Sequence, residues 1–245
     1  RQRKEREATG LCLIEGIQPV GQAVESGLTL EFVLTAPGRL TSGYAQTLVE
    51  QQRAQGVPVH PVAADVFESL TDKDHPAGLL AVAHSPRRSL ADLSPATFAW
   101  GAALVSPQDP GNVGTVARTL DAVGAAGLLL LEGGVDAYHP TAIRASMGAV
   151  FWQQVVAASF GEFLAWAHGH GYKLYGTSAQ HGMDYRRAAY TRPAIVLFGN
   201  EQKGLSRNQI AACQTLLTLP MRGRISSLNL AVAAGVILYR MMNDE

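Results

Sequence analysis

The sequence predicts an α/β protein in two parts, the second built on a mostly parallel sheet with helices on both faces. Two observations lead to this fold class. Apolar runs at 127–131 and 194–198 are bounded by polar turns, as buried parallel strands are. Segments with helical spacing lie between such runs, so strands and helices alternate. The 245 residues, 47% of them hydrophobic, suffice for one large α/β domain or for a small domain plus a medium one.

The first part, up to about Arg88, predicts a compact α/β sandwich. Turn-forming residues end several of its elements, among them Pro37 and Gly38 after the second strand and Gly56 after the second full helix. The expected strands are 10–16, 30–35, 57–62 and 78–83, and the expected helices are 19–26, 44–55 and 66–70.

A polar stretch with two prolines, S-P-R-R-S-L-A-D-L-S-P at 85–95, separates the two parts. The expected organisation is therefore a first domain at 1–88, a linker at 89–97 and a second domain at 98–245. In the second domain strands and helices alternate more strictly. The expected strands there are 98–105, 127–131, 155–157, 173–177, 194–198 and 216–219, and the expected helices are 112–123, 141–145, 160–168, 208–212 and 228–242.

Charge and cysteine content narrow the function classes. The net charge of +0 argues against a strongly basic nucleic-acid binder. Of 20 Lys and Arg residues only four are Lys, so 16 are Arg, whose planar fork suits phosphates; some are adjacent, as at Arg186 and Arg187. Cys12 and Cys213 are too few for a disulfide scaffold or a zinc site, and we expect both to be reduced and buried in a cytoplasmic protein.

Several familiar sites are not predicted. No G-x-G-x-x-G follows a strand and no G-x-S-x-G occurs. The near match to a phosphate-binding loop at 199–206 has Leu205 where lysine is required. His168 and His170 fall at an expected helix end, so no metal is expected. No apolar run approaches the roughly 20 residues that span a bilayer, so no membrane association is expected. The sequence begins at Arg1 without a methionine, so we expect residues upstream.

Three polar loops, each after an expected strand and before an expected helix, carry the candidate site. In the first, S-P-Q-D-P-G-N-V-G-T-V-A-R at 106–118, Asn112 is able to cap the helix or bond a substrate, and Arg118 lies six positions on, near the same face. Taken alone, this loop is better explained by an N-cap with a surface arginine. Because strand-to-helix turns are where α/β proteins bind substrates, three such loops indicate one shared site.

The second and third loops have their own ordinary explanations. L-F-G-N-E-Q-K-G-L-S at 197–206 places Gly199 and Glu201 after a buried strand, which a charged turn would also do. L-P-M-R-G-R-I-S-S-L-N-L-A-V-A at 219–233 offers Ser227 as the N-cap of the last helix and Asn229 as a polar group in its first turn.

These loops resemble the three signature motifs of the SpoU/TrmH group of the SPOUT superfamily, the RNA ribose 2′-O-methyltransferases. R-A-S-M-G-A-V-F at 144–151 also resembles a family stretch, and the resemblance covers about residues 102–239. Before it, I-E-G at 14–16 is similar to the small RNA-binding domain, related to certain ribosomal proteins, that precedes the catalytic domain in many members. The resemblance implies a deep trefoil knot near the C-terminus, S-adenosylmethionine as cofactor, and a homodimer whose active site is completed across the interface.

Motif matching also implies the roles of individual residues. Arg118 holds the ribose and phosphate or acts as the base; because a neutral arginine is very costly, we favour the first. Asn112 positions the ribose or Arg118, Glu201 holds its loop or orients Arg118, and Ser227 and Asn229 shape the pocket. The residues expected around the cofactor are Gly199, Leu219, Leu228, Leu197, Asn200 and Met221.

The expected function is methylation of a ribose 2′-OH in structured RNA, with ribosomal RNA favoured over transfer RNA because of the preceding domain. The alternatives are a transfer RNA methyltransferase, an inactive RNA-binding or ribosome-assembly factor, and a small-molecule methyltransferase on a Rossmann fold. No degenerate motif favours the inactive factor, and the missing Gly-rich turn counts against the Rossmann enzyme.

Overall fold

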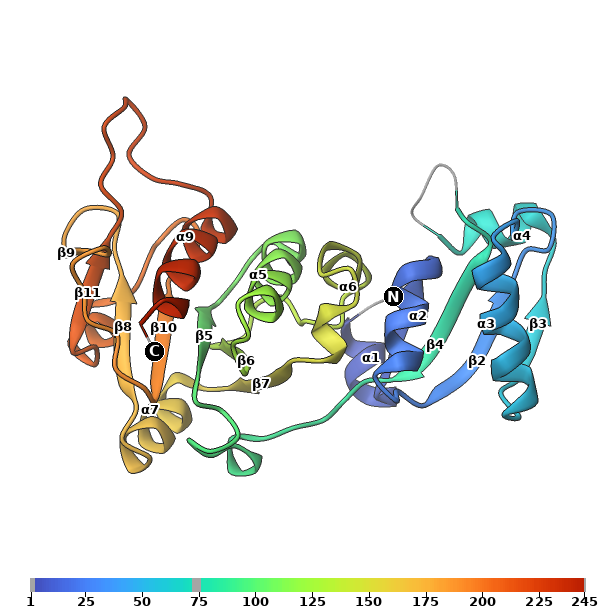
Figure 1. The fold of residues 1–245 in the computed structure, drawn as a ribbon, viewed down its shortest axis with the longest axis horizontal. Helices are drawn as coiled ribbons and strands as arrows, with labels where there is room; N and C mark the ends of the chain where they lie inside the picture. Colours follow the sequence, from blue (N-terminus) through green and yellow to red (C-terminus); the bar gives the residue numbers. More distant parts are fainter. Residues whose placement is uncertain (1–2, 72–75, 245) are drawn as a thin grey trace. The chain divides into compact units, whose positions relative to one another are not determined.

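The protein consists of two compact units, which the computed structural model describes for residues 3–71 and 76–244 (Figure 1). Unit 1 comprises Arg1–Pro86 and Tyr138–Trp152, and unit 2 comprises Arg87–Ala137 and Gln153–Glu245. Residues 138–152 thus belong to unit 1, although the residues before and after them belong to unit 2. The structural units differ in this respect from the predicted domains, because 138–152 packs with unit 1.

Unit 1 is a four-stranded sheet with helices around it. Strand β4 pairs antiparallel with β1 and with β2, while β3 pairs parallel with β2. Phe67 from α4 packs on Ala36 and Leu80, which gives the sheet its buried cluster. The elements of the first segment are α1 (Arg3–Thr9), β1 (Leu11–Glu15), α2 (Ile17–Glu25), β2 (Leu30–Thr35), α3 (Gly43–Ala54), β3 (Val59–Pro61), α4 (Ala64–Ser69) and β4 (Leu79–His84). Helix α1 was not expected from the sequence.

The second segment of unit 1 contains α6 (Pro140–Ala145) and the 3₁₀ helix η2 (Ala149–Phe151). It is attached to the first segment by a buried ion pair, in which Arg144 Nη1 lies 2.7 Å from Glu15 Oε2 and the Glu15 side chain is 2% exposed. Trp152 Nε1 donates to Gln22 Oε1 at 2.9 Å. Gly148 has a φ of 90°, and a Cβ there would lie 2.5 Å from Gln22 Cβ, so close packing and backbone conformation both require glycine.

Arg144→Ala is expected to destabilise unit 1 by about 3 kcal/mol, because it removes the charge partner of a buried carboxylate. Hydrogen exchange of peptides covering β1 measures this loss directly. The matched control is Arg53→Ala, since Arg53 pairs with Glu50 where the two side chains are 54% and 67% exposed. Exposed pairs contribute about 0–1 kcal/mol, so equal protection loss in both variants would contradict the expectation.

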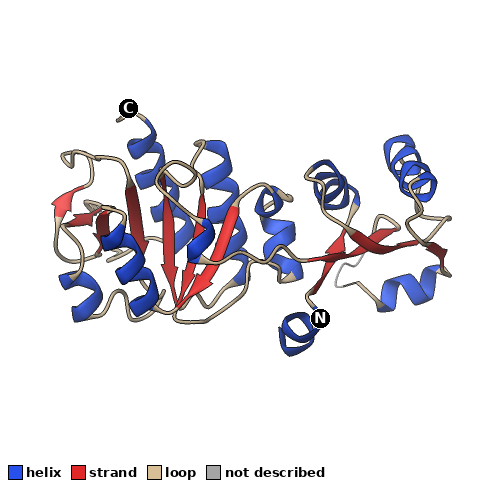
Figure 2. Cartoon of the chain, turned by 90° about the horizontal axis from the view of Figure 1, so that it is seen from below, coloured by secondary structure: helices blue, strands red, loops and turns tan. Residues whose placement is uncertain are grey.

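Unit 2 is built on a seven-stranded sheet in which every recorded pairing is parallel (Figure 2). The strand order is β7-β6-β5-β10-β8-β11-β9, so β5 and β10 are adjacent at the centre although the chain visits other strands between them. The strands are β5 (Trp100–Val105), β6 (Gly127–Leu131), β7 (Gln154–Ala158), β8 (Lys173–Thr177), β9 (Met183–Asp184), β10 (Ala194–Phe198) and β11 (Thr215–Thr218). The parallel sheet predicted from the sequence is confirmed, and β9 is an addition to it.

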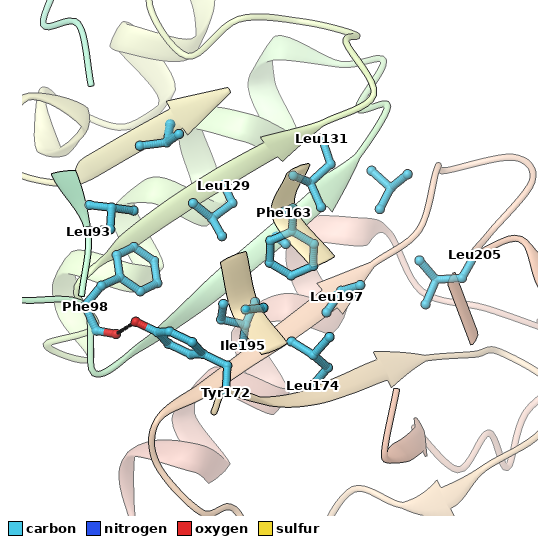
Figure 3. Close-up of a cluster of buried hydrophobic side chains, with 14 residues drawn as sticks. Leu93, Phe98, Leu129, Leu131, Phe163, Tyr172, Leu174, Ile195, Leu197 and Leu205 are labelled. Atoms are coloured by element: carbon cyan, nitrogen blue, oxygen red, sulfur yellow. Dashed lines mark hydrogen bonds between the residues drawn. The ribbon is translucent and has the colours of Figure 1, made fainter. Parts of the chain in front are cut away.

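Helices cover both faces of this sheet. On one face Phe163 of α7 lies in a cluster with Leu129 and Ile195 from the central strands (Figure 3). Successive strand residues point to opposite faces, so Leu104 and Leu128 are buried on the other side, where α5 contacts β5 and β6 and packs against α9. The helices of unit 2 are α5 (Pro110–Ala122), α7 (Phe160–Gly169), α8 (Arg207–Ala211) and α9 (Leu230–Met242), with the 3₁₀ helix η1 at Leu90–Asp92.

Tyr172 belongs to the same cluster, and its hydroxyl group donates a hydrogen bond to the Phe98 carbonyl at 2.6 Å (Figure 3). Burial raises the pKa of Tyr172 to about 12, so it stays a neutral donor. The stretch 89–97, expected as a linker, contributes Leu93 to the same cluster at 2% exposure. Of the two thiols expected to be buried, Cys12 is buried but Cys213 is only partly so. Among the described residues, no helix is long and apolar enough to cross a membrane.

Candidate active site

A cleft of about 560 Å³ opens at the carboxyl ends of β8, β10 and β11. Parallel strands end together at this edge, so the loops that follow them meet there. The predicted second and third loops both contribute to the cleft wall, and α9 closes it with Ala233 and Ile237. The predicted site residues that line it are Gly199, Asn200, Glu201, Leu219, Met221, Ser227, Leu228 and Asn229.

The second loop folds back tightly on itself after β10. Gly204 N donates to the Asn200 carbonyl at 2.8 Å, and Asn200 Oδ1 accepts from the backbone amides of Gln202 and Lys203 at 3.0 and 3.1 Å. A Cβ at Gly199 would lie 2.2 Å from the Gly204 carbonyl carbon, so only glycine fits this fold-back. The Asn200 amide also donates to the Ser106 carbonyl at 2.9 Å, which fixes the second loop to the first.

Glu201 holds the first loop. Its carboxylate accepts from Gln108 N at 3.2 Å, from Asp109 N at 3.4 Å and from Asn112 Nδ2 at 3.3 Å. These N–H groups precede or begin α5, where a negative charge is stabilised by the helix dipole. Of the two roles expected for Glu201, the geometry supports holding the loop: within the described part of the chain no hydrogen bond joins it to Arg118.

The third loop joins the same network through two asparagines. Asn229 Nδ2 donates to Asn112 Oδ1 at 3.0 Å, while Asn229 Oδ1 accepts from Ala231 N and Val232 N at 2.9 and 3.3 Å. Each amide therefore has a fixed orientation: Asn112 donates to Glu201 and accepts from Asn229. The relay Glu201–Asn112–Asn229 connects three loops that are separated by up to 117 residues in sequence.

Two helix starts differ from the expectation. Asn229, not Ser227, is the N-cap of α9, because its oxygen accepts from two amides of the first turn. Asp109 caps α5 with Pro110 in the first turn, so Asn112 lies inside the helix and is 7% exposed. Ser227 stays exposed on the cleft wall. Because Asp109 caps α5, the Asn112 side chain is available for the hydrogen bonds to Glu201 and Asn229.

Arg118 and Leu197 do not line the cleft. Arg118 is exposed on α5 and forms no hydrogen bond or ion pair with any residue that the structure describes. The Leu197 side chain is fully buried in the core cluster, and only its carbonyl, which accepts from Thr177 Oγ1 at 2.9 Å, is near the cleft. The side chain of Leu197 therefore supports the sheet.

Sequence reasoning missed one wall of the cleft. The loop after β8 supplies Ser178, Gln180 and His181, and the second loop adds Lys203. The position of β8 beside β10 explains the contribution, since both strands end at the same edge. The signal in the sequence was the polar run that follows the expected strand 173–177, which has no helix directly after it.

Comparisons with known protein families match both parts of the chain. The model of the SpoU rRNA methylase family matches residues 101–239, more than half of the sequence. The model of the MRM3-like substrate binding domain matches residues 1–81.

Individual relatives match nearly the whole chain. It is 32% identical to the 23S rRNA (uridine(2479)-2′-O)-methyltransferase of Streptomyces viridochromogenes over 99% of its length and 86% of the relative's. It is 29% identical to the 23S rRNA (guanosine(2553)-2′-O)-methyltransferase RlmP of Bacillus subtilis, covering 98% and 91% of the two chains. The crystal structure of the SpoU methyltransferase AviRb from Streptomyces viridochromogenes in complex with AdoMet is similar with a TM-score of 0.87 and 31% identity, over 98% of this chain and 93% of that one.

Proposed function

Because the chain belongs to the SpoU rRNA methylase family, we propose that it transfers a methyl group from S-adenosylmethionine to a ribose 2′-OH of ribosomal RNA. The observation that carries the proposal is the relay Glu201–Asn112–Asn229, which joins the three family loops at one cleft. Relatives that act on 23S rRNA are similar over almost their whole length, which favours the 23S molecule as substrate.

The cleft suits S-adenosylmethionine in size and lining. Its volume lies within the range of about 300–1,000 Å³ that is usual for cofactor sites. Leu219, Met221 and Leu228 offer apolar contacts for an adenine ring, and the missing Cβ at Gly199 lets residues 199–204 fold back as part of the cleft wall. When bound, the cofactor supplies an electrophilic methyl group on a positively charged sulfur.

Gly199→Ala is expected to weaken S-adenosylmethionine binding at least tenfold, because the new methyl group forces the fold-back of residues 199–204 open at a cost of about 1–3 kcal/mol. Titration calorimetry with the cofactor measures the effect. Gly161→Ala is the matched control, since a Cβ there meets nothing within 4 Å. Unchanged affinity in Gly199→Ala would show that the cofactor does not depend on this loop.

The remaining catalytic group is Arg118, which we propose to act in a homodimer. Arg118 is exposed on α5 beside α9, whose outer face presents Val232 and Tyr239 at 53% and 49% exposure. An exposed apolar face of this kind is typical of a subunit contact, and across it Arg118 would enter the partner's cleft. There the guanidinium holds the ribose and its phosphate while the 2′-OH oxygen takes the methyl group and gives its proton to water, with a neutral thioether as the leaving group. A metal has no part in these steps.

Family membership also supports the other features of the proposal. We infer that the chain is knotted in its C-terminal part, and that residues 1–88 bind RNA ahead of the linker 89–97 and the catalytic domain 98–245. The match of residues 1–81 to a substrate binding domain supports the RNA-binding role. We propose that it acts in the cytoplasm, where the ribosomal RNA of bacteria is located.

Methylation mapping tests the substrate. Ribosomal RNA from a strain lacking the gene is expected to lose one 2′-O-methyl group, which the purified protein restores in vitro with S-adenosylmethionine. A lost methyl group in transfer RNA instead would identify a transfer RNA enzyme. Cofactor binding without any methyl transfer, or no cofactor binding in calorimetry, would support an assembly factor and contradict the proposal.

A further inference from the structure

A second hollow of unit 2, the arginine groove, lies away from the cleft and has a volume of about 840 Å³. Its charged lining residues are Arg186, Arg187, Arg192, Arg240 and Asp244. They come from three segments: the stretch after β9, the residues before β10 and the end of α9. Only the first two arginines are adjacent in sequence, so the fold makes the cluster.

The groove lies at the opposite end of α9 from the cleft. Asn229 and Leu230 at the start of the helix line the cleft, while Arg240 near its end lines the groove. Ile237 of the same helix also lines the cleft, so the two hollows approach each other along α9, but no residue that the structure describes lines both. A ligand of the groove is therefore not the cofactor, although a long polymer is able to reach both sites.

Two of the arginines are neutralised by neighbouring carboxylates. Arg186 binds Asp184 through Nε, 3.0 Å from Oδ1, and through Nη2, 2.5 Å from Oδ2; this guanidinium holds the pKa of Asp184 down at about 2. Arg240 pairs with Asp244, which also accepts from Tyr190 N at 3.4 Å. These pairs stiffen the groove wall but leave little charge for a ligand.

The other two arginines form no ion pair with a carboxylate among the residues that the structure describes, although Arg187 is near enough to Asp184 to help lower its pKa. Arg192 is exposed with Cζ 5.0 Å from the centroid of the Trp100 ring, a contact that positions the guanidinium without neutralising it. Arg187 is exposed, and its backbone is fixed by a hydrogen bond from its N–H to the Asp184 carbonyl at 2.9 Å. With two carboxylates against four guanidinium groups, the groove keeps an excess of two positive charges in a chain of net charge +0.

We propose that the arginine groove binds the phosphate backbone of the RNA substrate on the catalytic unit, with Arg187 and Arg192 as the phosphate ligands. Planar guanidinium forks match phosphate oxygens, and the local excess of charge would otherwise be left unbalanced. Phosphate contacts fix the position and orientation of a nucleic acid without reading its sequence. The groove therefore positions the RNA and takes no part in the methyl transfer. The proposal rests on the proposed function, because it assigns a second contact to the same RNA.

The salt dependence of RNA binding tests the groove. The full-length protein is titrated with unmodified 23S rRNA transcribed in vitro, and the dissociation constant is measured against KCl concentration. For the double variant Arg187→Gln with Arg192→Gln, the slope of log affinity against log salt is expected to fall by about 1.5, because each lost phosphate contact contributes about 0.7–0.9. Affinity at physiological salt falls roughly tenfold, and KM for RNA rises while kcat and cofactor affinity stay unchanged.

The matched control is Arg207→Gln, an exposed arginine of the same unit outside the groove. Arg187→Gln alone leaves the Trp100 contact intact and is expected to lower the slope by about 0.7–0.9. If the double variant had the same salt slope as the control, the proposal would be overturned. A change of oligomeric mass in the variants would also overturn it, because the groove would then be a subunit contact. Failure of the wild type to methylate RNA that it binds would count against the proposed function, while the slopes would still decide the groove.

Discussion

Arg118→Ala is expected to lower methyl transfer by at least about 1,000-fold while leaving S-adenosylmethionine affinity nearly unchanged. The physical reason is that Arg118 does not line the cleft of its own chain, has no partner among the described residues and is the one cationic side chain of the first loop. Its removal therefore takes away the group that orients the ribose and its phosphate but nothing that holds the cofactor. Single-turnover kinetics with radiolabelled cofactor, together with calorimetry, separate the two quantities.

Arg118→Lys distinguishes the two chemical roles. If the arginine only orients the ribose and its phosphate, lysine keeps the charge but loses the fork, so part of the rate survives and the pH profile keeps its shape. If arginine is the base, the lower pKa of lysine moves the rising limb of the profile to lower pH. Arg207→Ala, which changes an exposed arginine on α8, serves as the control. Full activity in Arg118→Ala would remove this residue from the mechanism.

Asn112→Asp is expected to break the relay between the three loops. The substitution replaces the N–H donor that faces Glu201 Oε1 at 3.3 Å by a second carboxylate, and Asn112 is 7% exposed, so water screens the repulsion poorly. Loss of a hydrogen bond to a charged group costs about 2 kcal/mol. Because the first and second loops are held through this contact, cofactor affinity and methyl transfer both fall.

The defect of Asn112→Asp depends on pH in a defined direction. Two adjacent carboxylates raise the pKa of one of them above its value in the unfolded chain, since a shared proton restores the hydrogen bond. The repulsion is therefore absent at low pH and grows as pH rises through the raised pKa. Urea unfolding is expected to show a smaller difference from wild type at about pH 5 than at about pH 8. An equal difference at both would mean that the two side chains do not interact.

A second substitution provides the control. Adding Glu201→Gln to Asn112→Asp exchanges the amide and the carboxylate, so that a donor faces an acceptor again while Gln108 N still has an oxygen to bond. The double variant is expected to recover about 1–2 kcal/mol relative to the sum of the single changes. Additive losses would show that Glu201 and Asn112 act separately.

Much of the fold follows from local pattern. The strands 127–131 and 194–198 begin and end where the sequence predicts, because continuous apolar runs bounded by turn residues have few alternatives to a buried strand. Helix α1 and strand β9 were not predicted: α1 has no buried residue, and β9 has only two residues. Neither presents the apolar periodicity on which such predictions depend.

The candidate site was predictable as a set of loops but not as a geometry. The motifs identified Asn112, Glu201 and Asn229, since these residue types at these positions are a family signature. The hydrogen bonds between them could not be predicted from the sequence, because the bonded residues lie 89 or 117 positions apart. The N-cap of α9 was misassigned to Ser227 for a related reason: serine and asparagine are equally good caps, and the relay to Asn112 places Asn229 at the helix start.

The sequence by itself determined the fold class, the family and the residues of the three loops, because periodicity and short motifs are local properties of the chain. The tertiary structure decided what those residues contact. It joined I-E-G at 14–16 to the stretch at 144–151 through the buried Glu15–Arg144 pair, and it gathered dispersed arginines into one groove. Such pairings depend on strand order and on the packing of α9, and no local pattern encodes the distance between residues that are far apart in the chain.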